Sequence, residues 1–177
     1  HPGRQCPRLA NLTPLAPSEI QLDMAGNFGK PRAATEADIQ DIIGRFSQTA
    51  ALVKAAGLDG VQVHSAHGYL LSQFLSPRTN RRQDRWGGSL ANRARLLLEV
   101  VSAVRAHVGP AYPISVKLNS SDFVKGGFTL DESIQVVQWL NDAGIDLLEV
   151  SGGTYEQLEF FKPQAASEIR DSTRERE

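Results

Sequence analysis

The stretch that decides the fold is Asp59-Gly-Val-Gln-Val-His-Ser-Ala-His-Gly-Tyr-Leu-Leu-Ser-Gln-Phe-Leu-Ser-Pro-Arg78. It begins with a short apolar run over 60–64, typical of a buried strand, and continues into a short apolar helix over 70–75. His64, His67 and Tyr69 stand at the end of that strand, where α/β barrels and open α/β sheets place their chemistry. Two imidazoles can hold one substrate oxygen through N–H donors, and a phenol beside them can deliver a proton.

The same strand-and-helix pattern recurs on both sides of this stretch. Further strands are predicted over 114–118 and 147–151, and long helices are predicted to begin after Thr35, Ser89 and Thr129. The joints over 56–59 and 143–146 both read Ala-Gly, an apolar residue and Asp before a strand. Repeated joints of one kind predict α/β units on a parallel sheet.

Pattern alone leaves a closed (β/α)8 barrel and a doubly wound sheet both open. No Gly-x-Gly-x-x-Gly follows any predicted strand, which counts against a nucleotide-binding doubly wound domain. Three strands are predicted, with the tail of a fourth ending at His1, whereas a closed barrel needs eight. If the chain is a barrel, it is therefore an incomplete middle portion of one.

Two segments carry apolar residues whose burial the sequence predicts. Residues 1–34 are rich in proline and irregular, yet Leu9 and Leu12 among others favour a long loop packed across a surface. The helix after Thr129 carries Ile134, Val137 and Leu140 at helical spacing.

Bulk composition restricts the class of protein. The chain has 177 residues, 41% of them hydrophobic, which is enough for one domain with a sizeable core. A net charge of −1 gives no global field that would attract nucleic acid or an anionic membrane. No apolar run reaches the roughly 20 residues of a spanning helix, and no signal peptide is visible.

The single cysteine and the chain ends give two further expectations. Cys6 cannot form an internal disulfide, which favours a reducing, cytoplasmic location. The chain starts at His1 rather than Met and finishes at Glu175-Arg-Glu177 without a helix stop. We therefore expect residues 1–177 to be a single partial domain, truncated at both ends.

The two histidines admit three interpretations. A lone histidine at a strand end is usually a structural group, but two at i and i+3 followed by Tyr69 favour function. A metal site is disfavoured, because zinc binds at least three protein ligands. Asp59 and Glu149 are expected at the wrong end of a strand or on the wrong face of the sheet to serve as the third. The remaining role is electrophilic: neutral imidazoles donate to a carbonyl or nitro oxygen. Tyr69 is then a candidate general acid, although its ring could simply pack on its apolar neighbours.

Two cationic features need a similar choice. Lys117 lies inside an apolar strand, where it either extends to one end or aims a cation at a bound anion or electron-rich ring. We favour the second interpretation because this strand end forms the expected pocket. The arginine-rich run over 78–85 could contact phosphates, but Asp84 interrupts it and a structural loop fits better. Gly152 and Gly153 leave room either for a close ligand or for a plain turn.

The residues resemble the Old Yellow Enzyme family of NADH:flavin oxidoreductases. The resemblance lies in the run from Asp59 to Arg82 and in Gly87-Gly-Ser-Leu-Ala-Asn-Arg-Ala-Arg95. It extends to His1-Pro-Gly-Arg4, which resembles the end of that family's third barrel strand, and to Val150-Ser-Gly-Gly153, which resembles the end of its sixth. The resemblance covers essentially the whole chain. It implies a (β/α)8 TIM barrel of which this chain holds about strands 4 to 6.

The resemblance also implies roles for individual residues. His64 and His67 bind the activating oxygen of an electron-poor alkene, and Tyr69 matches the proton donor. Lys117 falls where the family usually has an arginine beside a non-covalently bound FMN, so the charge is kept while the forked geometry is lost. NAD(P)H reduces the flavin and leaves, and an enone or nitroalkene then takes its place.

One expectation and one alternative complete this interpretation. The family's flavin-phosphate site belongs to the seventh and eighth strand loops, so we expect the 177-residue chain alone to bind FMN poorly or not at all. The alternative is a truncated, non-catalytic remnant of such a barrel that serves as a structural or partner-binding chain.

Overall fold

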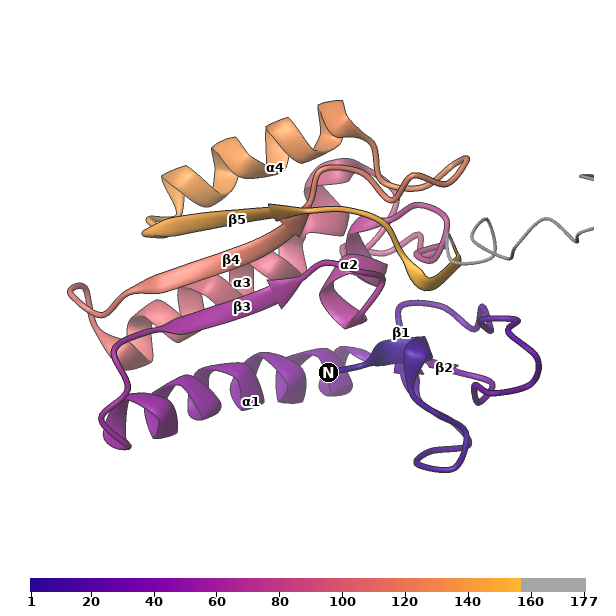
Figure 1. Ribbon diagram of the computed structural model, residues 1–177, viewed down its shortest axis with the longest axis horizontal. Helices are drawn as coiled ribbons and strands as arrows, with labels where there is room; N and C mark the ends of the chain where they lie inside the picture. The colour runs from indigo at the N-terminus through magenta and orange to yellow at the C-terminus, as the bar shows by residue number, and fades with distance from the viewer. Residues whose placement is uncertain (157–177) are drawn as a thin grey trace, which may run out of the picture.

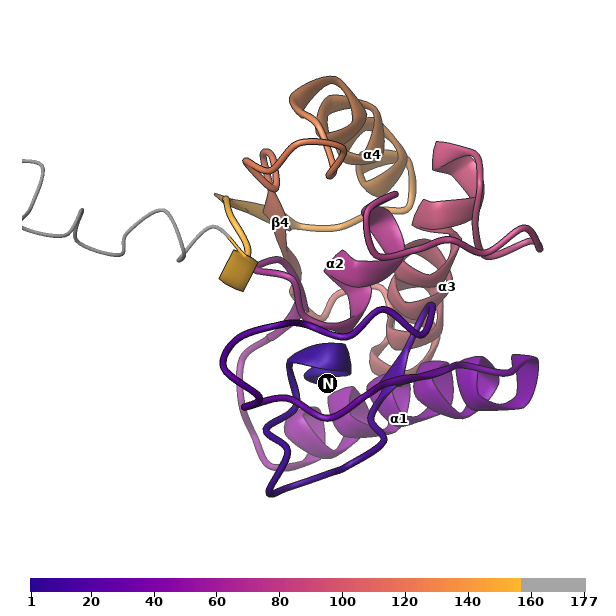
Figure 2. The ribbon, with the colours of Figure 1, turned by 90° about the vertical axis from the view of Figure 1, so that its right-hand side faces the viewer.

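The computed structural model describes residues 1–156, which form alternating strands and helices (Figure 1). Three parallel strands form one sheet in the order β3-β4-β5: β3 (Val61–Ser65), β4 (Ile114–Asn119) and β5 (Leu147–Ser151). The helices are α1 (Glu36–Ala55), α2 (Leu70–Leu75), α3 (Leu90–Val108) and α4 (Leu130–Asp142). The three long helices lie on the same side of the sheet (Figure 2). This arrangement is the α/β architecture that the sequence predicts.

The predicted helix boundaries are confirmed, and local chemistry explains them. Thr35 and Thr129 each form a capping box, with Asp38 and Glu132 as the reciprocal partners. α1 and α4 then end in the same way, because Ala56 and Ala143 have almost identical backbone angles. The glycines after them adopt the left-handed conformation that terminates a helix, with φ of 82° at position 57 and 75° at position 144.

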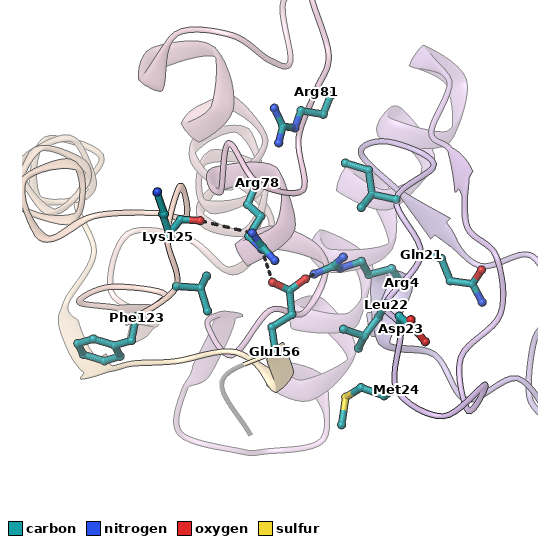
Figure 3. A pocket seen from close by; sticks show the side chains of 12 residues that line it. Arg4, Gln21, Leu22, Asp23, Met24, Arg78, Arg81, Phe123, Lys125 and Glu156 are labelled. Carbon is teal, nitrogen blue, oxygen red and sulfur yellow. Dashed lines mark hydrogen bonds and ion pairs between the residues drawn. The ribbon is translucent and has the colours of Figure 1, made fainter. Parts of the chain in front are cut away.

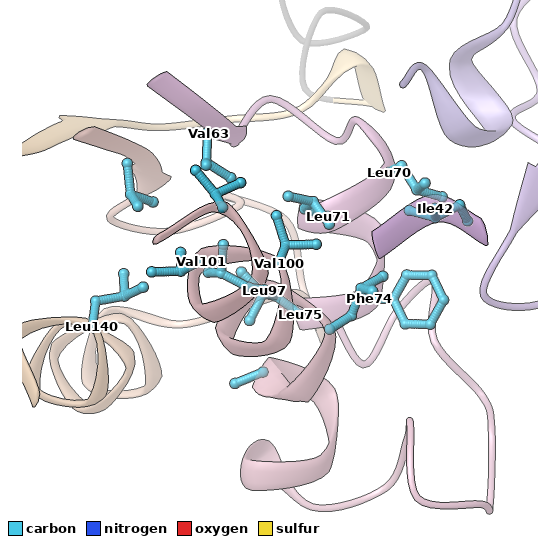
Figure 4. Close-up of a cluster of buried hydrophobic side chains, with 14 of the residues drawn as sticks. Ile42, Val63, Leu70, Leu71, Phe74, Leu75, Leu97, Val100, Val101 and Leu140 are labelled. Atoms are coloured by element: carbon cyan, nitrogen blue, oxygen red, sulfur yellow. The ribbon is translucent and has the colours of Figure 1, made fainter. Parts of the chain in front are cut away.

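The core lies between the sheet and its helices (Figure 4). The predicted apolar stripe of α3 is buried, with Leu96, Leu97, Val100, Val101 and Val104 each at most 1% exposed. Alternate residues of β4 face this core, namely Ile114, Val116 and Leu118. The intervening side chains, including Lys117, point to the opposite face of the sheet, so that face is polar and carries the site residues.

The N-terminal segment is only partly as predicted. It is irregular apart from a 3-10 turn, η1 (Gly3–Gln5), and a short parallel pair, β1 (Leu15–Ala16) with β2 (Arg32–Ala33). Leu22 and Phe28 are buried, which agrees with a loop packed on the surface. The expectation was wrong for Leu9 and Leu12, which are fully and largely exposed. They lie in the loop that follows η1, where the N–H groups of Ala10 and Asn11 both donate to the Pro7 carbonyl oxygen.

Two smaller expectations also need correction. In α4 the buried stripe is Ser133, Val136 and Leu140, whereas Ile134 is 52% exposed. A short helix with six apolar residues permits more than one phase, and contact with the sheet selects this one. His1 lies in no strand, although its carbonyl oxygen accepts a hydrogen bond from Leu70 at the start of α2.

The expectation about the end of the chain, at Glu175–Glu177, lies outside the described residues. Among the helices in positions 1–156, none combines the length and the apolarity needed to cross a bilayer.

Candidate active site

Three charged or titratable side chains form a row across the polar face of the sheet. His64 of β3 stands opposite Lys117 of β4, and Lys117 stands opposite Glu149 of β5. Because paired residues in neighbouring strands project to the same face, these three side chains are neighbours. The row lies toward the carboxyl ends of the strands, next to the turn that carries His67 and Tyr69.

Lys117 is paired within this row. Its Nζ lies 2.7 Å from a carboxylate oxygen of Glu149, and the other oxygen accepts a 2.8 Å bond from the amide of Gln62. The bonds from Lys117 and Gln62 hold the pKa of Glu149 below its usual value, so the carboxylate is ionised at neutral pH. The expectation that Glu149 has the wrong facing was incorrect, because the strand register places it beside Lys117.

His67 has an unusual backbone conformation for a residue with a side chain. Its φ is +60°, a left-handed value that costs on the order of 1–3 kcal/mol for a non-glycine residue. Two long-range bonds hold it: its N–H donates to Oδ1 of Asn119 at 3.1 Å, and its carbonyl oxygen accepts from the Gln5 amide at 3.1 Å. A 2.5 Å bond between Nε2 and Oγ of Ser151 then orients the ring. The chain thus holds a strained turn at the end of β3.

This turn brings the predicted site residues together. The His64 ring lies with its centroid 5.3 Å from that of His67 and 5.2 Å from that of Tyr69. A fourth side chain, which the sequence did not suggest, joins this group. The hydroxyl of Tyr155 lies 2.8 Å from the hydroxyl of Tyr69. Tyr155 comes from the segment after β5 and is 86 positions away in the chain, so no local spacing points to it.

The environment keeps both imidazoles neutral at pH 7. Burial, reinforced by His67 and Lys117, lowers the pKa of His64; burial and the nearby Lys117 cation lower the pKa of His67. The pKa of Tyr69 is raised, first by its bond to Tyr155 and then by burial. Neutral imidazoles are hydrogen-bond donors without a charge, and a protonated phenol can release a proton. Two such donors and one acid beside each other suit a substrate with an acceptor oxygen.

The lowered histidine pKa values predict a dependence of stability on pH. Below about pH 6.5 the unfolded chain binds protons that the folded site resists, so the free energy of unfolding decreases as the pH falls through this range. Urea denaturation at pH 7.5 and 5.5 measures this loss. We expect a smaller loss in the double variant His64→Asn/His67→Asn and an unchanged loss in His107→Asn. An equal loss in all three proteins would contradict the prediction.

The other candidate features have structural roles. Arg82 donates to the carbonyl oxygens of Pro17 and Ala34, so the arginine-rich loop ties the N-terminal segment to the domain. The space beside Gly152 is filled by Phe123, because a Cβ there would lie 2.4 Å from the ring. The room that this glycine leaves is therefore taken up by the protein itself.

Sequence comparison assigns the chain to a family. The model of the NADH:flavin oxidoreductase / NADH oxidase family matches residues 1–175. The chain belongs to this family, and its three-stranded sheet with flanking helices is part of a (β/α)8 barrel.

Individual relatives agree with the assignment. The chain is 44% identical, over 90% of its length, to "NADH-dependent flavin oxidoreductase nadA" of Aspergillus parasiticus, and 43% identical, over 89%, to "NADH oxidase" of Thermoanaerobacter brockii. It covers 36% and 24% of those proteins. A structure of morphinone reductase in complex with tetrahydroNAD superposes with a TM-score of 0.73 at 31% identity, over 85% of this chain and 46% of that one. The chain thus spans less than half the length of these relatives.

Proposed function

We propose that this chain supplies the substrate-activating and proton-donating part of an FMN-dependent enzyme that reduces electron-poor alkenes, with NAD(P)H as the electron donor. The observation that supports it most is the convergence of the His64, His67 and Tyr69 rings at the end of β3, held by a strained backbone. The family match and the names of the relatives support the flavin and the nicotinamide donor. Residues 1–177 are then one partial barrel domain.

The residues present fit one edge of the cofactor. The Lys117 ammonium group stands on the polar face next to His64, where it can donate to an oxygen or nitrogen of a flat redox ring. Its bond to Glu149 fixes the direction of the side chain while offsetting part of its charge. FMN, when bound, supplies the hydride that an alkene needs at its β-carbon.

The chain's own residues perform the remaining tasks. The imidazoles of His64 and His67 donate hydrogen bonds to the carbonyl or nitro oxygen of the alkene and stabilise the negative charge that develops there. Tyr69 transfers its hydroxyl proton to the α-carbon. The Tyr155 hydroxyl, 2.8 Å away, holds the Tyr69 hydroxyl in its protonated form until the transfer. Together with the hydride at the β-carbon, this proton completes the saturated product.

The test uses the complete protein that contains this chain, loaded with FMN. Anaerobic addition of NADH or NADPH should bleach the flavin absorbance, and subsequent addition of an enone should restore it while forming the saturated ketone. A flavin that is reduced but is not reoxidised by any enone or nitroalkene would contradict the proposed substrate class. A protein that takes up no flavin would instead favour the non-catalytic remnant.

The bond between the two tyrosines gives a separate prediction. Because the Tyr155 hydroxyl raises the pKa of Tyr69, Tyr155→Phe should shift the alkaline limb of the pH profile for alkene reduction to lower pH. The rate at neutral pH should fall by less than about 10-fold, since the proton donor itself remains. Tyr112→Phe is the matched control, because its hydroxyl donates to the Leu58 carbonyl oxygen away from the site. If the alkaline limb of the Tyr155→Phe profile stayed at the same pH, the Tyr155 hydroxyl would have no effect on the pKa of Tyr69.

A further inference from the structure

A cavity of about 870 Å³ lies near the candidate site, and its lining does not include His64, His67 or Tyr69. Residues that are neighbours in the chain connect the site to the cavity: Gln5 contacts His67 and Tyr155 contacts Tyr69, whereas the adjacent Arg4 and Glu156 line the cavity. Its volume lies within the range of sites for small organic ligands. No step of the proposed alkene reduction uses this cavity.

Charge in the cavity is predominantly positive (Figure 3). The charged side chains that line it are Arg4, Asp23, Arg78, Arg81, Lys125 and Glu156, four cations and two carboxylates. Glu156 is held between two of the cations, Arg4 and Arg78. Burial works to raise the pKa of Glu156, but the bonds from these two guanidinium groups outweigh it and keep the pKa below its usual value. The carboxylate therefore stays ionised and fixes both arginines in place.

Donor capacity remains after this pairing. Arg4 is 4% exposed, and its Nε is buried without a hydrogen-bond partner among residues 1–156. Such a buried unpaired donor is costly, on the order of 1–3 kcal/mol. Arg81 and Lys125 are exposed, and within the same described part of the chain their side chains form no ion pair. The cavity thus offers two unneutralised cations, which suits a ligand that carries about two negative charges.

The rest of the wall suits a flat apolar group. Its apolar side chains are Ile20, Leu22, Met24, Phe123 and Val124. Phe123 is 57% exposed even though its backbone has a left-handed φ of +54°, a strained value for an aromatic residue. Its N–H donates to Oγ of Ser121, and its ring is backed by Gly152. The loop therefore places this ring and Lys125 in the wall of the same cavity.

We propose that this cavity binds a nucleoside phosphate, with the phosphates at Arg81 and Lys125 and the base against Phe123. Arginine and lysine form charge-assisted hydrogen bonds to phosphate oxygens. Any base can stack on an aromatic ring, because every base has a π-face. The natural source is the adenosine diphosphate part of the nicotinamide dinucleotide, and in this respect the inference rests on the proposed function. The cavity is then a site that holds the reductant by the end that does not react.

Isothermal titration calorimetry on the complete protein tests the site without turnover, with ADP as the probe. The double variant Arg81→Ala/Lys125→Ala should weaken ADP binding about 10- to 100-fold, because it removes two charged donors. The double variant Arg8→Ala/Lys30→Ala makes the same change of charge on exposed residues that do not line the cavity, and should leave the affinity unchanged. No ADP binding to the unaltered protein, or an equal loss in both double variants, would overturn the proposal.

Inorganic pyrophosphate separates the two halves of the ligand. Phe123→Leu should weaken ADP binding by about 3- to 10-fold and leave pyrophosphate binding unchanged, since stacking involves only the base. Equal effects on both probes would overturn the nucleoside assignment. The outcome is independent of the proposed reaction: intact ADP binding without alkene reduction would remove the proposed function alone, and intact reduction without ADP binding would remove only this site.

Discussion

Replacing Tyr69 with phenylalanine is expected to slow alkene reduction by about 10²- to 10⁴-fold, the usual contribution of a positioned general acid. The substitution removes only the hydroxyl, so the ring contact with His64 at 5.2 Å is retained. Reduction of the flavin by NAD(P)H should be largely unchanged, because that step needs no proton from the phenol. Stopped-flow measurement of the two half-reactions separately, in the complete protein, gives both rates.

The comparison of half-reactions is what makes this variant informative. A misfolded site would slow both steps, whereas loss of a proton donor slows one. Tyr112→Phe serves as the control for loss of a tyrosine hydroxyl elsewhere in the domain. Equal losses in the two half-reactions of Tyr69→Phe would refute the role of Tyr69 as the acid.

The second large effect is expected at His64. Its replacement with alanine removes one of the two proposed donors to the substrate oxygen, and loss of such a donor typically costs about 10²- to 10³-fold in rate. The loss should appear mainly in kcat for the alkene, because the developing negative charge is bound more tightly than the ground-state oxygen. Steady-state kinetics with an enone, at saturating reductant, measure it.

His107 offers a matched control for this substitution. It is an exposed histidine in the last turn of α3, where its ring contacts the Ala103 carbonyl oxygen. His107→Ala should leave the rate within about two-fold, since changes at exposed positions are usually small. If the two histidine variants behaved alike, the imidazole of His64 would have no part in binding the substrate oxygen.

The elements of the fold could be predicted because their signals are local. Thr35 and Thr129 cap the starts of their helices through partners only three residues away. The Ala-Gly pairs at 56–57 and 143–144 end the same two helices. Such contacts lie within one turn of the chain and do not depend on tertiary structure. The buried face of α4 could not be predicted in this way, because contact with the sheet determines which of its apolar residues are buried.

The candidate site was predictable only in part, for the same reason. The spacing of His64, His67 and Tyr69 is visible in the sequence, but the left-handed turn at His67 depends on Asn119 and Gln5, which are 52 and 62 residues away. Strand register, which no single strand encodes, pairs Lys117 with Glu149. Tyr155 reaches Tyr69 only after β5 has joined the sheet.

A crystal structure of the complete protein with an enone bound would test the convergence of the three rings most directly. We predict that the carbonyl oxygen lies about 2.7–3.1 Å from an imidazole nitrogen of both His64 and His67. The Tyr69 hydroxyl should then face the α-carbon. An enone whose oxygen binds away from both histidines, with Tyr69 directed elsewhere, would contradict the account.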